Sequence, residues 1–196
     1  MTADPAADPA ADPADDPAGQ PRWLSDDQQR AWRRFINVVG LLPLALDRQM
    51  QAEADIPHTY FLILARLSEA PDRCLRMSDL AKALLVSPSR LSHAVARLVG
   101  RGWVSRADDP TDGRVQYAVL SDDGMSVLEA TAPGHAAEVL RLVFDGLSTE
   151  QVAQLEQIST VLLGRIEADC PTTLIDGQRS LKDNADRRAT LTGEQR

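Results

Sequence analysis

The sequence has few cysteines and no long apolar run, and each shortage excludes a class of protein. Among 196 residues only Cys74 and Cys170 are cysteines, too few for a disulfide framework and without metal-ligand spacing. The longest strongly apolar stretch, 38–46, is interrupted by Gly40 and Pro43 and is far too short to cross a membrane. The first residues lack the basic start and the apolar segment of a signal peptide. We therefore expect a cytoplasmic protein.

Motifs of common enzyme classes are also missing. The sequence contains no G-x-S-x-G, no H-E-x-x-H, no dinucleotide-binding glycine pattern and no cluster of Cys and His. The three histidines, at 58, 93 and 135, are not at metal-ligand spacing. We therefore expect no enzyme, with no catalytic residues, no cofactor and no metal site.

Charge is unevenly distributed along the chain. The net charge is −8, and residues 1–20 carry five acids and no base. Residues 75–115, in contrast, carry seven basic residues against four acidic ones. The field at a contacting face decides whether a polyanion binds, so an acidic chain with this basic segment can still bind nucleic acid.

The two ends differ in composition from the middle of the chain. Residues 1–22 are rich in Ala, Asp and Pro, with proline at about every fourth position, which prevents a regular helix. We expect a disordered acidic tail there, and a flexible polar tail at 169–196, where periodicity is lost.

Helical periodicity dominates between these tails. A helix is expected within 23–56, and a second one opens at Pro57. Apolar residues recur at helical spacing between 35 and 50 and again between 152 and 166. In the C-terminal helical region, 125–168, Pro133-Gly134 is expected to interrupt a helix.

Two short helices joined by about four residues follow, which is the pattern of a helix-turn-helix. Ser87 can cap the second helix, with Pro88 at its first position. Its inward face is expected to hold Leu91, Val95 and Leu98. Its outward face holds Ser89, Arg90, His93 and Arg97, with Ser92 at the edge. A solvated surface helix would look similar, but no acid occurs between Ser87 and Ser105, and short hydroxyl and Arg side chains suit a DNA groove.

The stretch DDPTDGR, 108–114, raises three alternatives. A calcium loop aligned on Gly113 would place Pro110 and Val119 where oxygen ligands are required, so that alternative fails. A phosphate cradle would lead into a helix, whereas this loop leads into a strand. The third alternative is a hairpin turn, for which Asp-Gly is a strong signal.

The strand-like segments 103–107 and 115–120 flank this loop. A hairpin directly after a helix-turn-helix is a wing, whose tip can place a cation in the minor groove of DNA. Arg114 is the candidate cation, and Asp112 is expected to brace it as an ion pair.

The segment 77–124 resembles the winged-helix core of the MarR family of bacterial transcription regulators. That family carries a D-x-x-D-x-R wing, followed by a strand that ends in Leu-Thr/Ser and by a Gly. The matching residues here are Asp109, Asp112, Arg114, Leu120-Ser121 and Gly124. Thr111 stands where the family often has Arg. With its surrounding helices, the resemblance covers roughly residues 25–168.

The resemblance implies a mainly α fold with a small β-hairpin. A winged helix-turn-helix region, 57–124, would be flanked by an N-terminal dimerisation helix, 23–56, and by C-terminal dimerisation helices, 125–168. It further implies a homodimeric, sequence-specific regulator of double-stranded DNA on a pseudo-palindromic operator, acting as a repressor released by a small aromatic or phenolic ligand.

The expected site residues fall into two groups. The residues predicted to contact DNA are Ser87, Ser89, Arg90, Ser92, His93, Arg97, Arg106, Asp112 and Arg114. Those predicted to line a ligand cleft are Trp32, Arg48, His58 and Tyr60.

Two alternatives remain open. The first is a winged helix that binds protein instead of DNA. The second is redox sensing by Cys74, whose pKa the neighbouring Arg73 and Arg76 would lower. The oxidation-sensing branch of the family uses a cysteine in the first helix, and this chain has none there.

Overall fold

The computed structural model describes residues 22–109, 112 and 115–169. The predicted tails lie almost wholly outside these ranges, as do Arg114 and Cys170. Within the described residues, no helix is both long and apolar enough to cross a membrane.

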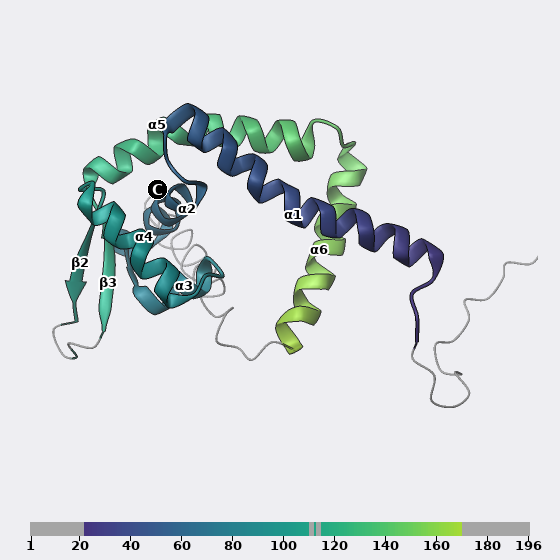
Figure 1. Cartoon of the computed structure of the whole chain (residues 1–196), viewed down its shortest axis with the longest axis horizontal. Helices are drawn as coiled ribbons and strands as arrows, with labels where there is room; N and C mark the ends of the chain where they lie inside the picture. Colours follow the sequence, from purple (N-terminus) through teal and green to yellow (C-terminus); the bar gives the residue numbers. More distant parts are fainter. Residues whose placement is uncertain (1–21, 110–111, 113–114, 170–196) are drawn as a thin grey trace, which may run out of the picture. The chain divides into compact units, whose positions relative to one another are not determined.

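The described chain is mainly helical with one small sheet, which confirms the predicted fold class (Figure 1). The elements, in order, are α1 (Asp26–Ala54), α2 (His58–Glu69), a 3-10 turn (Pro71–Arg73), β1 (Cys74–Arg76), α3 (Met77–Ala83), α4 (Pro88–Gly100), β2 (Val104–Asp108), β3 (Gln116–Leu120), α5 (Asp122–Val139), a π-helical turn (Leu140–Phe144) and α6 (Thr149–Asp169). The chain divides into two units within α1, between Gly40 and Leu41.

The sheet is antiparallel, with the strand order β1-β3-β2. Val104 of β2 pairs with Leu120 of β3, so these two strands form the predicted hairpin. On the other side of β3, Cys74 of β1 pairs with Val119. The sequence does not predict β1, because three residues are too few to show a strand period.

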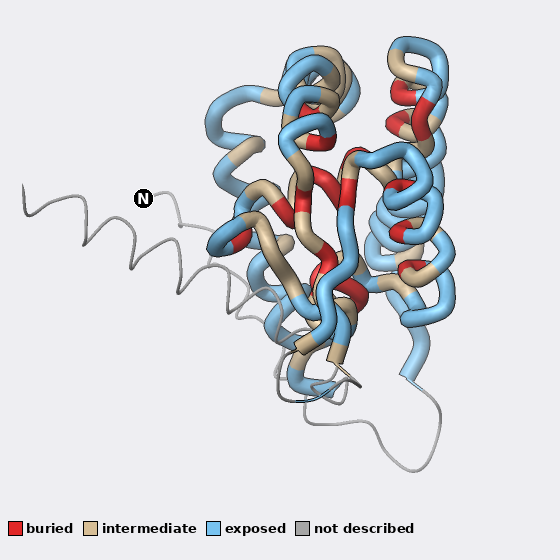
Figure 2. Tube along the Cα trace, turned by 90° about the vertical axis from the view of Figure 1, so that its left-hand side faces the viewer, coloured by how far each residue is buried: buried red, intermediate tan, exposed pale blue. Residues whose placement is uncertain are grey.

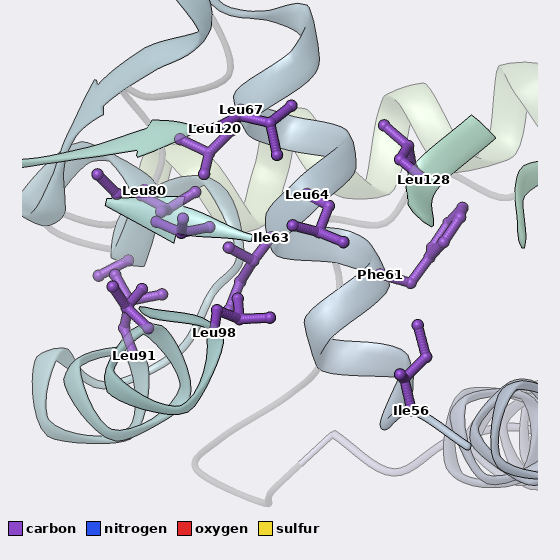
Figure 3. Packing of buried hydrophobic residues seen from close by; sticks show 14 of the residues in the cluster. Ile56, Phe61, Ile63, Leu64, Leu67, Leu80, Leu91, Leu98, Leu120 and Leu128 are labelled. Atoms are coloured by element: carbon purple, nitrogen blue, oxygen red, sulfur yellow. The ribbon is translucent and has the colours of Figure 1, made fainter. Parts of the chain in front are cut away.

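α2 is the central element of the hydrophobic core in the second unit. Ile63, Leu64 and Leu67 are fully buried, and Phe61 nearly so. Ile63 points toward α4 and Phe61 toward α5 (Figure 3). Burying each side chain of this size contributes about 1.5–3 kcal/mol, so α2 holds α4 and α5 on one scaffold. The helices α2, α4 and α5 of this unit each carry both buried and exposed positions (Figure 2).

Two helices carry large apolar side chains that the single chain leaves exposed. Trp32, Phe35 and Val39 in the first half of α1 are 47–52% exposed. α6 has no buried residue, and Ile158 and Ile166 are more than half exposed. The apolar stripe predicted at 152–166 is therefore largely exposed, whereas the one predicted at 35–50 is exposed only in its first part, because Leu46 and Met50 are buried. Exposed apolar patches of this kind mark an interaction surface.

The predicted interruption at Pro133-Gly134 is wrong. α5 runs unbroken from Asp122 to Val139, with Pro133 inside it. A proline inside a helix costs about 3 kcal/mol, so tertiary contacts must offset that cost. His135 supplies one, because its ring stacks on Phe61 with the centroids 4.3 Å apart.

Gly124, at the start of α5, is the position where the fold tolerates no side chain. A Cβ there would overlap the backbone carbonyl of Trp103 and lie 2.8 Å from Leu120 Cδ1. We expect Gly124→Ala to lower the free energy of unfolding by about 1–3 kcal/mol, because backbone rather than a flexible side chain must move. Urea unfolding at matched protein concentration measures the change.

Gly100→Ala is the matched control, since Gly100 is also helical and a Cβ at this position would meet no atom within 4 Å. That variant should be neutral or gain up to about 1 kcal/mol from helix propensity. Equal stability of the two variants would contradict the packing described for Gly124.

Candidate nucleic-acid interface

The turn between α3 and α4 is held by local hydrogen bonds. Leu85 adopts a left-handed conformation with φ of 54°, which reverses the chain after α3. The backbone N–H of Val86 then donates to the carbonyl of Ala81 at 3.1 Å. Ser87 Oγ accepts from the N–H of Arg90 at 3.3 Å, so Ser87 caps α4 as predicted.

α4 has one buried face and one exposed face, as its sequence pattern predicts. Leu91, Val95 and Leu98 are at most 1% exposed and pack in the core. The exposed residues of α4 include Ser89, Arg90, His93 and Arg97, and Ser92 is half-buried. No residue of α4 is acidic. The outward face therefore presents positive charge and hydroxyl groups on a rigid helix.

Arg106 of β2 braces the hairpin against α4. Its Nη2 donates to the carbonyl oxygen of Ser92 at 3.0 Å and lies 3.3 Å from Ser92 Oγ. Both residues were predicted to contact DNA. The structure adds a positioning role, because this contact joins the hairpin to the exposed face of α4.

The base of the hairpin loop is organised around Asp109. Its N–H donates to the carbonyl of Val115 at 3.0 Å, and its Oδ1 accepts from the N–H of Asp112 at 3.2 Å. Asp109 Oδ2 accepts from the hydroxyl of Tyr117 at 3.1 Å. Asp112 is exposed, while its predicted partner Arg114 lies outside the described residues.

Tyr117 and Arg76 are two residues of this network that sequence reasoning missed. Arg76 Nε donates to Tyr117 Oη at 3.0 Å, which connects β1, β3 and the loop base. The guanidinium also lies over the tyrosine ring, 5.7 Å from its centroid. The two residues are 41 positions apart, so only the pairing of β1 with β3 brings them together.

A groove of about 520 Å³ lies between the start of α2 and the α4 face. Tyr60 lines it from α2, and Arg90, His93 and Arg97 line it from α4. It combines an aromatic ring with two guanidinium groups, which suits a small aromatic anion.

The other predicted ligand residues lie elsewhere. His58 is not among the described residues that line the groove, and it faces His135 of α5 instead. Arg48 Nε donates to the carbonyl of Leu44 on its own helix at 3.3 Å. Trp32 belongs to the first unit, where its ring is tilted against that of Phe35.

Cys74 is not an activated thiol. Burial raises its pKa above the ordinary value, and the nearby carboxylate of Asp72 raises it further. The expectation that Arg73 and Arg76 lower this pKa is wrong. Arg73 instead pairs with Asp122 at 2.9 Å, and Arg76 bonds to Tyr117.

Side chains that can ligate a metal ion do not cluster in the described part of the chain. There, no three His, Cys, Asp or Glu residues come together in a way that could hold a metal ion.

Comparison with known proteins identifies the family. Residues 54–115 match the profile of the MarR family. The chain is 46% identical to Sco3205, a MarR family transcriptional regulator from Streptomyces coelicolor solved in complex with DNA. That alignment has a TM-score of 0.71 and covers 79% of this chain and 94% of Sco3205. AbsC, a MarR family regulator from the same organism, is 34% identical with a TM-score of 0.70, over 76% of this chain and all of AbsC.

A curated relative agrees with these structures. The transcriptional repressor MprA of Escherichia coli K12 is 31% identical over 113 residues, which are 57% of this chain and 63% of the repressor. The match thus spans less than two thirds of MprA. All three relatives are named as transcriptional regulators or repressors, in agreement with the prediction that the chain is not an enzyme. The chain belongs to the MarR family of transcriptional regulators.

Proposed function

We propose that the chain is a sequence-specific repressor that binds double-stranded DNA as a homodimer. The observation that carries this proposal is the outward face of α4, which is basic, rich in hydroxyls, free of acids and fixed on a buried core. The DNA complex solved for Sco3205 supports it.

In this proposal α4 enters the major groove. Its first two turns carry Ser89, Arg90 and His93, which can reach base edges or phosphates. The β2–β3 hairpin, braced by Arg106, then reaches the adjacent minor groove through Arg114. In this proposal Asp112 holds Arg114 in place through an ion pair.

The exposed apolar stripes of α1 and α6 support a homodimer. One chain leaves them uncovered, and a twofold partner with the same stripes would bury both. Two copies of α4 would then meet successive major grooves about 34–36 Å apart, on a pseudo-palindromic operator. Such a protein acts in the cytoplasm, at the nucleoid.

The groove beside α4 suggests how DNA would be released. Arg90 and Arg97 line the groove and also belong to the proposed DNA-binding face. A small aromatic anion held against Tyr60 would engage these guanidinium groups and compete with phosphate for them. Displacement of bound DNA by simple aromatic acids tests this part of the proposal.

Genome-wide mapping of bound sites tests the function directly. The proposal expects a limited set of sites that share a pseudo-palindromic sequence, which a purified protein then binds in preference to random DNA. Failure to find sequence-selective binding would contradict it and would favour a winged helix that binds protein.

The arginines of α4 should contribute to operator affinity through contacts with DNA phosphates. We expect Arg90→Ala or Arg97→Ala to weaken operator binding and to leave folding intact. Either change should also reduce the slope of log K against log salt by about 1 for each phosphate that is no longer neutralised. Fluorescence anisotropy over a salt series measures both the affinity and the slope. Arg141→Ala, outside α4 and the hairpin, is the control of equal charge, and an equal effect there would argue against a local contact.

The wing should contribute to operator affinity through Arg114. We expect Arg114→Ala to cost on the order of 1–3 kcal/mol in operator affinity without unfolding the protein. Anisotropy with the mapped operator, together with a thermal melt, provides the measurement. Binding as tight as that of the unaltered protein would remove the wing from the proposed interface.

Tyr117 should act indirectly, by positioning the hairpin. Tyr117→Phe removes the hydroxyl that links Arg76 to Asp109, so we expect a loss of about 0.5–1.5 kcal/mol in operator affinity with an unchanged salt dependence. Tyr60→Phe, outside this network, is the matched control and should keep full affinity. A change in salt dependence for Tyr117→Phe would instead indicate that the tyrosine hydroxyl acts on a phosphate.

A further inference from the structure

His58 and His135 form a close pair that joins α2 to α5. The two residues are 77 positions apart, and their Nε2 atoms lie 3.0 Å from each other. The two rings meet through these edges, with centroids 5.1 Å apart and planes 19° apart, and both side chains are half-buried. Phe61 stacks against both imidazoles and covers one side of the pair.

The contact depends on how many protons the pair carries. At 3.0 Å one Nε2 must donate and the other must accept through its lone pair. The pair can therefore form when both rings are neutral, or when one is charged. When both rings are protonated, two N–H groups and two positive charges face each other, and the contact cannot form.

The surroundings of His58 and His135 favour the neutral form of both imidazoles. Burial lowers the pKa of His58 and of His135, and the proximity of His135 lowers that of His58 further. On α1, Asp47 acts in the opposite direction on His58 and also accepts from its backbone N–H at 2.8 Å. The other carboxylates nearby are Glu53 of α1, beside Gly134, and Glu138 of α5, which Arg141 neutralises.

The location of the pair connects it to the DNA-binding face. His58 is the first residue of α2, and its neighbours Pro57, Thr59 and Tyr60 line the groove shared with α4. α5 leads through the π-helical turn into α6. The His58–His135 contact therefore joins two parts of the protein. On α2 it lies beside the groove shared with α4, and on α5 it lies in the helix that leads to α6 and the proposed dimer interface.

A metal ion is the competing occupant of two converging imidazoles. A zinc site needs three or four protein ligands, and among the described residues no third His, Cys, Asp or Glu completes the set. The observations therefore favour a proton over a metal ion.

We propose that His58 and His135 are a proton-sensitive latch between α2 and α5, which opens on acidification and weakens DNA binding. The DNA-binding consequence rests on the proposed function, whereas the effect on stability does not.

The sign of the effect follows from the lowered pKa values. Histidine in the unfolded chain titrates at about pH 6.5, so there the unfolded state binds more protons than the folded state. The stabilisation by the latch is fully present above that pH and is lost as the pH falls through the lower, folded-state pKa values.

The test compares the full chain with His135→Gln, which keeps a polar side chain but cannot be protonated in this range. Between pH 7.5 and 5.5, where carboxylates are already ionised, the denaturant midpoint of the unaltered protein should fall. The midpoint of His135→Gln should fall less, because the proximity of His135 no longer lowers the pKa of His58. His93→Gln, which removes the exposed histidine of α4, should keep the full pH dependence of stability. His58→Gln tests the same contact from α2 if His135→Gln folds poorly.

Operator affinity provides the second readout. The unaltered protein should lose on the order of tenfold in affinity over this range, the equivalent of one pKa unit, and His135→Gln should lose much less. Equal pH dependence of stability in the two proteins would overturn the latch, as would a response that disappears with EDTA. A chain that binds no DNA at any pH would refute the proposed function, while the denaturant series would still decide the latch.

Discussion

The burial of α2 is the constraint on which the rest of the second unit depends. Phe61, Ile63 and Leu64 enter the core from this one helix. Ile63 faces α4 on one side, and Phe61 faces α5 on the other (Figure 3). Because Leu91, Val95 and Leu98 of α4 are buried in the same core, the opposite side of α4 has to face outward. The arginines and serines of that helix are thus oriented outward by the hydrophobic packing of its opposite face.

The hairpin depends on the same scaffold through polar contacts. Arg106 connects β2 to Ser92 of α4, and Tyr117 connects β3 to the loop base and to Arg76 of β1. Each of these bonds contributes only about 0.5–1.5 kcal/mol, so they orient the hairpin without dominating the stability of the fold. This division suits the proposed wing, whose base would have to be held in place.

Local signals in the sequence predicted much of this structure. Ser87-Pro88 marks the start of α4 because capping is a local interaction, and the leucine spacing then assigns its faces. Contacts between distant residues could not be predicted in this way. The His58–His135 pair spans 77 positions, and the Cys74 thiol is governed by burial and Asp72 rather than by the arginines beside it in sequence. The continuous α5 shows the same limit, since tertiary contacts that include the stacking of His135 on Phe61 outweigh a proline that favours a break.

In the proposed function, two copies of the α4 face read one DNA site together. Hydroxyl-radical footprinting of the chain on a mapped site tests this most directly, because it reports each protected position along both strands. A homodimer that places both α4 helices in successive major grooves should protect two half-sites related by a twofold axis, with centres about one helical turn, or 10–10.5 base pairs, apart. A single protected segment without symmetry, or protection that does not depend on sequence, would contradict it.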